Sequence, residues 1–300
     1  MKRIIDLSQY NTVTNMVQAA ASCDGVIIRL GIRGYAGGKL KVDNKFAEYV
    51  NALISMGKPW GVYFVTQAVS SAEAESEATY CLSILSGLDR KNMLHGVWCD
   101  TEYSNSLHTG RADRLSKARR TQYVNAFCQR IRTGGYKAGV YCSESWAKTQ
   151  LVQNHIIYPF WIAKYGKNNG KENEKPTVTH EMWQYTSVGT IPGIKGNVDI
   201  SVMMEADTVY KKIDYAPVFN AQYYADKYND LKAVFGYDAA RLLAHFANYG
   251  MREHRRACEE FNPVAYRARY KDLQDVFDDD WTAYYLHYIQ HGKAEGRNGK

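Results

Sequence analysis

Several features that define large classes of protein are missing from this sequence. No apolar run is long enough to cross a membrane, and residues 1–8 hold too short an apolar stretch for a secretory signal. The six cysteines form no C-x-x-C pair, and several fall inside apolar segments. We therefore expect buried thiols in a chain made in the cytoplasm, without Sec export or membrane insertion.

A nucleic-acid partner is not indicated either, although the net charge is +7. Residues 1–213 hold 26 basic and 18 acidic side chains, whereas residues 214–300 hold 12 and 13. The densest basic run, residues 111–132, has the pattern of a solvated helix, and no basic stripe is interleaved with aromatics. An anionic polymer such as a bacterial cell wall would suit the basic part equally well.

Strand-like and helix-like segments alternate along residues 1–213. Eight segments have the composition and pattern of strands: Arg3–Leu7, Gly25–Leu30, Gly61–Thr66, Gly96–Glu102, Ala138–Ser143, Phe160–Tyr165, Glu181–Thr186 and Val198–Met203. Helical patterns fill the early gaps, at Val13–Ala21, Lys45–Met56, Ala72–Ser86 and Leu115–Thr133. The later gaps are short or polar, notably Gly166–Thr179. The pattern predicts an α/β fold, an irregular eight-stranded β/α barrel without helices in its last third.

Two carboxylates stand one residue apart in the segment GVWCDTE, at Asp100 and Glu102. Side chains at positions i and i+2 of a strand share a face, and active sites of β/α barrels lie where strands end. Asp6 near the end of the first strand and Asp199 in the last are expected at the same mouth. A pair of solvated acids explains Asp100 and Glu102 alone, but four converging acids would repel one another and favour a functional site.

Aromatic residues also gather on the predicted strands. A cluster of rings beside carboxylates is typical of a sugar-binding cleft, because rings stack on the apolar faces of pyranoses. The candidates for substrate binding are Tyr63, Tyr141, Trp161 and Trp183. For any single one of them the alternative is a place in the hydrophobic core.

Residues 214–300 contain an internal repeat. Residues 219–255 align without gaps on residues 261–297, sharing an FN start, tyrosines, a histidine, a glycine and a final arginine. Each copy is predicted to form two short helices with a glycine stop, and the shared aromatics and histidines are expected to form its core. If the repeats bind a wall polymer, the pocket residues suggested by the pattern are Tyr223, Tyr224, Tyr266 and Arg297. Dimerisation, or capping of the barrel, is the alternative role.

Taken together, these blocks resemble glycoside hydrolase family 25, the lysozyme-like N-acetylmuramidases of bacteria and their phages. The resemblance covers residues 1–213 and rests on ordered motifs: Asp6-x-Ser8-x-Tyr10, GVIIRLG, GVYFVT, GVWCDTE, AGVYCS, FWIAKY and MWQYTSVGTIPGIKGNVDIS. It implies a peptidoglycan hydrolase that cuts the β-1,4 bond after N-acetylmuramic acid with retention and needs no cofactor or metal. The repeats look like tandem repeats of other bacterial surface and lytic proteins, a weaker match.

By matching position, the resemblance makes Glu102 the general acid and Asp100 the residue that positions or stabilises the reacting sugar. Asp6 and Asp199 complete the acidic floor. Attack by a carboxylate and assistance by the substrate's N-acetyl group both give retention, and we favour assistance. A phage endolysin or an autolysin that reaches the wall after release is expected.

Two other functions remain open at this stage. A catalytically inactive barrel would act as a wall lectin, although the intact set of four acids argues against it. A metal-dependent polysaccharide deacetylase would also use clustered acids. His95 begins a strand and His108 lies in a loop, so neither has metal-ligand spacing to the acids.

Overall fold

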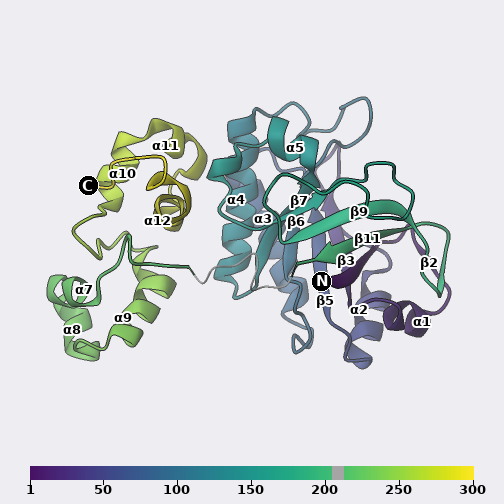
Figure 1. Ribbon diagram of the computed structural model, residues 1–300, viewed down its shortest axis with the longest axis horizontal. Helices are drawn as coiled ribbons and strands as arrows, with labels where there is room; N and C mark the ends of the chain where they lie inside the picture. Colours follow the sequence, from purple (N-terminus) through teal and green to yellow (C-terminus); the bar gives the residue numbers. More distant parts are fainter. Residues whose placement is uncertain (205–212) are drawn as a thin grey trace. The chain divides into compact units, whose positions relative to one another are not determined.

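The computed structural model describes residues 1–204 and 213–300. The chain divides into two compact units, Met1–Gln153 with Tyr158–Val209, and Asn154–Ile157 with Tyr210–Lys300. The first is an α/β barrel and the second is helical (Figure 1). The last part of the predicted catalytic region, residues 205–212, lies outside the described residues. None of the described helices is long and apolar enough to cross a membrane.

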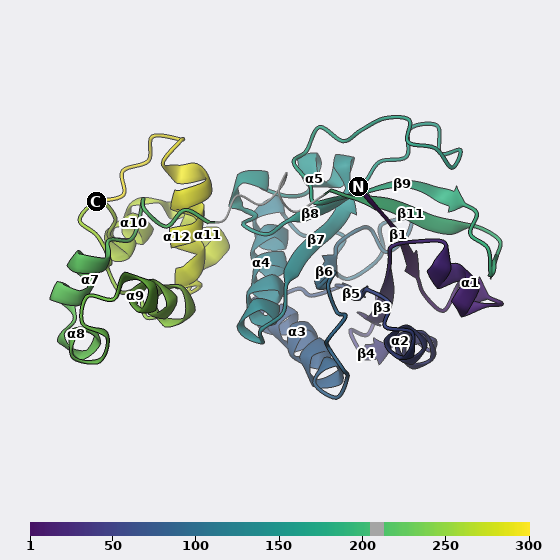
Figure 2. The same ribbon diagram turned by 60° about the horizontal axis from the view of Figure 1, so that its bottom comes forward.

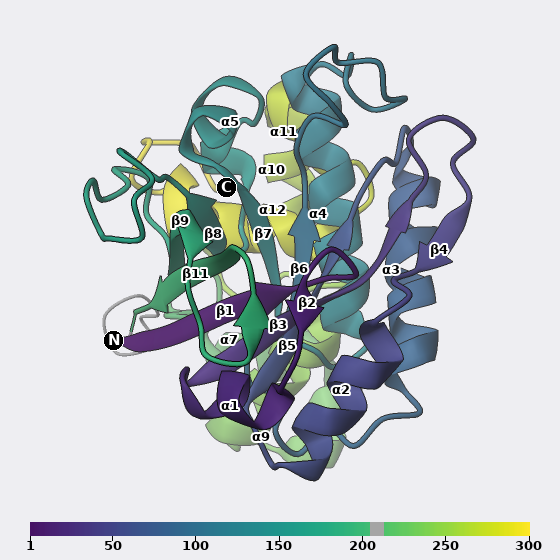
Figure 3. The ribbon, with the colours of Figure 1, turned by 90° about the vertical axis from the view of Figure 1, so that its right-hand side faces the viewer.

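Eight strands close into a barrel, as the sequence pattern predicts. In chain order they are β1 (Lys2–Leu7), β3 (Gly25–Arg33), β5 (Trp60–Val65), β6 (Val97–Asp100), β7 (Ala138–Ser143), β8 (Phe160–Ala163), β9 (Met182–Gly189) and β11 (Val198–Met203). Their order around the barrel is β1-β11-β9-β8-β7-β6-β5-β3, and pairing between β1 and β3 completes the circle. Figure 3 shows β1 between β11 and β3.

One barrel strand runs against the others. β11 pairs antiparallel with both β1 and β9, whereas the remaining barrel pairs are parallel. Three short strands lie outside the circle: β4 (Leu40–Val42) pairs with β3, and β2 (Thr12–Val13) pairs with β10 (Ile194–Lys195). The barrel is therefore mixed, and its reversed strand decides which residues reach its mouth.

Helices follow the early strands and are missing late, as predicted. They are α1 (Met16–Ala21), α2 (Phe46–Ser55), α3 (Ser71–Leu85), α4 (Lys117–Thr133), α5 (Glu144–Thr149) and the 3-10 turn η1 (Gln153–His155). The longest two, α3 and α4, lie side by side outside the strands (Figure 2). Ser70 and Ser116 begin them as N-caps, each hydroxyl accepting a backbone N–H three residues on. In the described part of the chain, no helix joins β8 to β9.

The barrel interior is layered because alternate residues of each strand point inward. The lower layer is apolar and fully enclosed; it contains Ile4, Ile27, Trp98, Trp161, Met182 and Met203, with Tyr63 and Tyr141 packed against it. Two residues further along β1, β3, β6 and β9, the inward positions are polar, at Asp6, Arg29, Asp100 and Gln184. All six cysteines are free and buried, which confirms their expected role as core thiols.

The second unit contains the two repeats, each with more elements than the sequence suggested. The first is built from α7 (Ala221–Lys227), α8 (Asn229–Phe235), α9 (Ala239–His245) and the π-helix η2 (Phe246–Gly250). The second has α10 (Pro263–Arg269), α11 (Lys271–Phe277), α12 (Trp281–His287) and the π-helix η3 (Tyr288–Gly292). The prediction of two helices for each copy is corrected to three α-helices followed by a short π-helix. Extended backbone at Tyr228 and Tyr270, which neither glycine nor proline marks, separates the first two helices.

Residues shared by the copies make the same contacts in both. The Tyr224 hydroxyl lies 3.1 Å from Nδ1 of His245, and the Tyr266 hydroxyl lies 3.0 Å from Nδ1 of His287. Tyr224 and Tyr266 are fully buried. This confirms the shared-core interpretation for the two tyrosines and corrects the suggestion that they line a ligand pocket.

The last shared residue of each copy is an arginine that closes the repeat. Arg255 donates to both carboxylate oxygens of Asp230, and Arg297 donates to both oxygens of Asp272. Each guanidinium also lies 4.7 Å from the centre of a tyrosine ring. Arg297 therefore has a structural role within the repeat, and its suggested place in a ligand pocket stays a prediction.

Candidate active site

Four carboxylates gather at one end of the barrel. Asp6 lies in β1, Asp100 ends β6, Glu102 follows two residues later, and Asp199 is the second residue of β11. Asp6 and Asp199 are register partners on adjacent strands. Burial is the largest cause that raises the pKa of Asp6, and the charges of Asp199 and Glu102 add to it. The structure therefore brings all four sequence-predicted acids together.

The backbone holds Asp100 and Glu102 in place from both sides. Thr66 donates its N–H to the Asp100 carbonyl, and Thr101 donates its N–H to the Tyr141 carbonyl. β6 ends at Asp100, so the predicted strand extends two residues too far at its carboxyl end. Glu102 thus stands just beyond the last ladder bond, at the start of the connection to α4.

Side-chain hydrogen bonds and an ion pair hold the connection that contains Glu102. The Asp113 carboxylate accepts hydrogen bonds from the Ser104 N–H and hydroxyl and from the Gly110 N–H. Arg111 makes a two-pronged ion pair with Glu73 of α3, at 2.7 and 2.9 Å. These bonds fix a segment that has no regular structure of its own.

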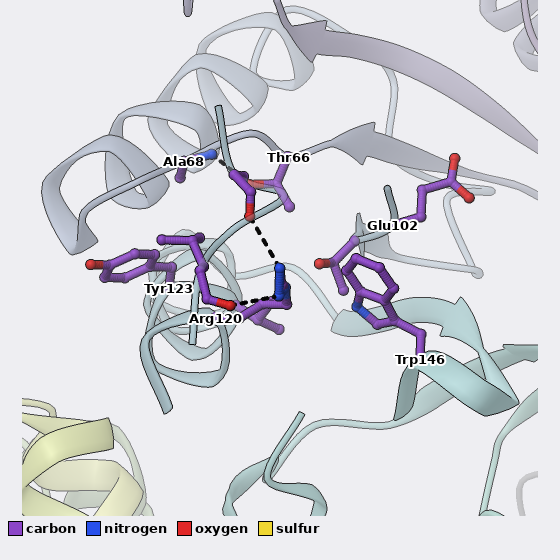
Figure 4. A pocket seen from close by; sticks show the side chains of 10 residues that line it. Thr66, Ala68, Glu102, Arg120, Tyr123 and Trp146 are labelled. Atoms are coloured by element: carbon purple, nitrogen blue, oxygen red, sulfur yellow. Dashed lines mark hydrogen bonds between the residues drawn. The ribbon is translucent and has the colours of Figure 1, made fainter. Parts of the chain in front are cut away.

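A small pocket lies behind Glu102. Arg120, buried in α4, donates to the carbonyls of Ala112 and Asp113, and its guanidinium lies 4.6 Å from the centre of the Trp146 ring. Figure 4 shows the Glu102 carboxylate turned away from this pocket. The pocket lies behind the loop, and Glu102 as a residue is exposed.

Burial and mutual repulsion shift the ionisation of the other acids. Burial, with the charges of Glu102 and Asp6, raises the pKa of Asp100 well above its usual value. Glu102 is exposed as a residue, but protein surrounds its carboxyl group, and this partial burial, with the charge of Asp199, raises its pKa. Burial raises the pKa of Asp199 to about 6. Such a set can hold protonated and ionised carboxyl groups side by side near neutral pH.

One cation stands among these acids, and the sequence analysis did not single it out. Arg29 of β3 lowers the pKa of Asp100. Its guanidinium is fixed by Asp43 at 2.6 Å and lies 4.8 Å from the centre of the exposed Tyr10 ring. The sequence does contain an indication of this role, because Arg29 interrupts the otherwise apolar segment GVIIRLG.

Gln184 is a second residue that the sequence analysis did not assign, although it lies in the quoted motif. Its Nε2 donates to Oδ2 of Asp6 at 2.8 Å. Its Oε1 accepts from the hydroxyls of Tyr141 at 2.8 Å and Tyr165 at 2.7 Å. The side chain thus connects β7 and the end of β8 to an acid on β1.

The four predicted aromatic residues occupy three different places. Tyr63 and Tyr141 are partly buried and pack against the apolar layer. Burial is the main cause that raises their pKa values, and the charges of nearby acids add to it. Trp161 is 1% exposed within that layer and donates to the Ser201 hydroxyl. Trp183 is 2% exposed and next to inward-facing Gln184, so alternation turns it outward. In this structure neither tryptophan has a free ring face for a sugar.

Two exposed aromatics lie at the mouth instead. Tyr10 is 79% exposed and Tyr35 is 39% exposed. Burial, together with the charges of Glu102 and Asp100, raises the pKa of Tyr35. No group of three His, Cys, Asp or Glu side chains suited to a metal ion is found in residues 1–204 and 213–300.

Known proteins share the barrel. The sequence profile of glycosyl hydrolases family 25 matches residues 5–194. The modular autolysin LytC of Streptococcus pneumoniae, solved with a synthetic peptidoglycan ligand, has a TM-score of 0.58 and 28% identity. That similarity covers 68% of this chain but only 46% of the autolysin.

Two further solved structures share the fold at lower identity. The catalytic domain of endolysin ply40 from bacteriophage P40 of Listeria monocytogenes has a TM-score of 0.57 at 22% identity, covering 70% of this chain and 95% of that one. The bacterial lysozyme of Streptomyces coelicolor has a TM-score of 0.56 at 22% identity, covering 69% and 94%. A comparison with curated proteins finds no match.

Proposed function

This chain belongs to glycosyl hydrolase family 25, and we propose that it is an N-acetylmuramidase that cleaves the β-1,4 bond between N-acetylmuramic acid and N-acetylglucosamine in peptidoglycan. The observation that carries the proposal is the convergence of Asp6, Asp100, Glu102 and Asp199 on one barrel mouth. Supporting evidence comes from the S. pneumoniae autolysin, a similar protein that was solved with a peptidoglycan ligand.

Glu102 is proposed as the general acid that protonates the glycosidic oxygen. Glu102 is an exposed residue that a polymer can reach, and its raised pKa keeps the proton available at higher pH. A general acid of this kind needs a pKa near the working pH, and burial with a neighbouring acid is the usual means of reaching it.

Asp100 is proposed to orient the substrate's 2-acetamido group, which then attacks the anomeric carbon and gives net retention. Its Oδ1 is buried and has no hydrogen-bond partner among the described residues, so it offers an acceptor for the acetamido N–H. The positive charge that develops on the sugar would be stabilised by Asp6 and Asp199. Direct attack by a carboxylate is the alternative, and it would require the two carboxyl groups to be about 5 Å apart.

Sugar rings are proposed to lie against Tyr63 and Tyr141 at the floor of the mouth and against Tyr10 and Tyr35 at its rim. The exposed rings of Tyr10 and Tyr35 supply apolar faces that a sugar can reach. Trp161 and Trp183 are left out of this proposal because both are buried.

The repeats of residues 214–300 are proposed to anchor the enzyme to a wall polymer, as expected of an endolysin or autolysin. Their nearly balanced charge favours a specific contact over a general attraction to an anionic wall. A fragment of residues 1–213 should then cleave soluble glycans normally but lyse cells poorly, since anchoring raises local enzyme concentration. Equal lysis by the fragment and the full chain would remove the anchoring role and leave dimerisation or capping.

One digestion experiment separates the hydrolase from its two alternatives. Purified peptidoglycan is incubated with the full chain or with Glu102→Gln, with and without EDTA, and both reducing ends and acetate are measured. A muramidase releases reducing ends without acetate, independently of EDTA, and the variant does not. A lectin releases neither product, whereas a metal-dependent deacetylase releases acetate and is stopped by EDTA.

A further inference from the structure

Three side chains from different strands converge on Asp6 through one amide. Gln184 of β9 is 2% exposed and stands between Asp6 on one side and two phenols on the other. Tyr141 comes from β7, and Tyr165 follows the end of β8. Both hydroxyls donate to the amide oxygen, at 2.8 and 2.7 Å, while the amide nitrogen donates to Asp6.

This arrangement is tied to the charge of Asp6. An ionised carboxylate only accepts hydrogen bonds, so it requires the NH₂ end of the amide. A protonated carboxyl can donate, and the amide can then turn over and offer Asp6 its oxygen. The two phenols oppose that turn, because it would take away the oxygen that accepts both of their O–H groups, and their donation polarises the amide toward stronger donation by its nitrogen.

We propose that Tyr141 and Tyr165 are positioning residues that hold the Gln184 amide with its nitrogen toward Asp6 and so bias Asp6 toward the carboxylate. The role of Asp6 as a fixed negative charge beneath the reacting sugar rests on the function proposed above. The orientation of the amide and its effect on Asp6 do not.

The neighbours of Asp6 show why such a bias is needed. Acids surround it, with Asp199 on β11 and Asp100 and Glu102 from β6 and its extension. Tyr63 of β5 also faces it, and Arg29 of β3, the cation that lowers the pKa of Asp100, is held by Asp43. Burial and the acids favour the protonated form of Asp6, whereas the Gln184 hydrogen bond lowers its pKa. The amide is therefore the main group that keeps a charge on Asp6.

The test is a titration of Asp6 in the full chain that needs no substrate. Carboxyl groups are labelled with carbon-13, and the signal of Asp6 is identified by its loss in Asp6→Asn. In Tyr141→Phe with Tyr165→Phe, the midpoint of Asp6 should rise by about 0.5 to 1 pH unit, as expected for losing the support of neutral hydrogen bonds. Gln184→Leu should raise it at least as much.

The combination of these variants separates positioning from general damage. In the Gln184→Leu background, the two tyrosine replacements should add no further shift, because their effect passes through the amide. Tyr185→Phe is the matched control, since it removes a phenol from the outward face of the same strand and should leave the midpoint unchanged.

The proposal is overturned if the double phenylalanine variant titrates like the parent chain, or if it shifts Asp6 equally when Gln184 is absent. A control variant that shifts the midpoint as far would also overturn it, because any loss of packing would then suffice. A wrong muramidase assignment gives a result that can be told apart from this one. In that case peptidoglycan stays intact, while Asp6 still titrates as proposed in each variant.

Discussion

Asp6 and Asp199 are directly opposite each other on the antiparallel strands β1 and β11. Opposed residues of such a pair bring their Cβ atoms within about 5.5 Å, and like charges there repel. A purely structural barrel gains nothing from this pairing. At a mouth that binds a sugar as proposed, the same closeness of acids raises their pKa values, and those that remain ionised supply negative potential.

Asp199→Asn should narrow the active pH range from the alkaline side. The charge of Asp199 raises the pKa of Glu102, and the general acid acts in its protonated form. Removing that charge lowers the pKa of Glu102, so the alkaline limb of the kcat/KM profile should move to lower pH. Asp89→Asn, in an exposed loop, is the control. An unmoved limb in Asp199→Asn would show that Asp199 does not tune the acid.

Asp100→Asn should make the protein more stable near neutral pH while impairing catalysis. Burial with nearby acids raises the pKa of Asp100, so the native state binds its proton more tightly than the unfolded chain does. The contribution of Asp100 to the free energy of unfolding is therefore complete below the ordinary aspartate pKa. It is lost as the pH rises through the raised pKa that Asp100 has in the native state.

Thermal unfolding at two pH values tests this expectation for Asp100. The variant should melt above the parent at pH 7.5, by about 2–4 °C for each kcal/mol of repulsion removed, and close to it at pH 4. A variant that is less stable at pH 7.5 would indicate that the Asp100 carboxylate supports the fold.

Glu102→Gln should abolish nearly all turnover without unfolding the protein. The amide keeps the shape of the side chain but has no acidic proton, and general acid catalysis contributes about 10²–10⁴-fold. Turnover of soluble glycan and the melting temperature are measured together. Retention of more than about a tenth of the parent rate, with an unchanged melting temperature, would remove Glu102 from the role of acid.

The turn after α11 contains a strained residue whose counterpart in the other repeat is glycine. Asp278 has φ 45° and ψ −113°, and Gly236 at the equivalent place has φ 56° and ψ −128°. This conformation favours glycine because it lacks a Cβ atom. Asp278→Gly should therefore stabilise the protein, by roughly 1 kcal/mol, and Gly236→Asp should destabilise it. Denaturant unfolding measures both, and destabilisation by Asp278→Gly would contradict the strain.

The sequence predicted the eight strands because they depend on local periodicity, and it predicted that Asp6, Asp100 and Glu102 meet because all three lie at strand ends. It did not reveal the direction of β11, which depends on a distant pairing. In a fully parallel barrel Asp199, near the start of its strand, would lie at the end opposite Asp6. The antiparallel course of β11 places it beside Asp6 instead.

Side-chain roles were harder to predict where neighbours share a motif. Trp183 and Gln184 are adjacent in the sequence, yet strand alternation sends one outward and the other to Asp6. Strand pattern alone also could not tell that Trp161 lies one layer below the mouth, in the apolar core. Arg29 could have been found, because a charged residue inside an apolar strand needs partners.

The identity of the sugar at each new chain end tests the central claim most directly. Peptidoglycan digested by the full chain is reduced with borohydride, and its fragments are analysed by mass spectrometry, with Glu102→Gln as the blank. The account predicts reduced N-acetylmuramic acid at the new ends, produced only by the parent chain. New ends carrying reduced N-acetylglucosamine would show that the other glycosidic bond is cut, and would contradict the assignment as a muramidase.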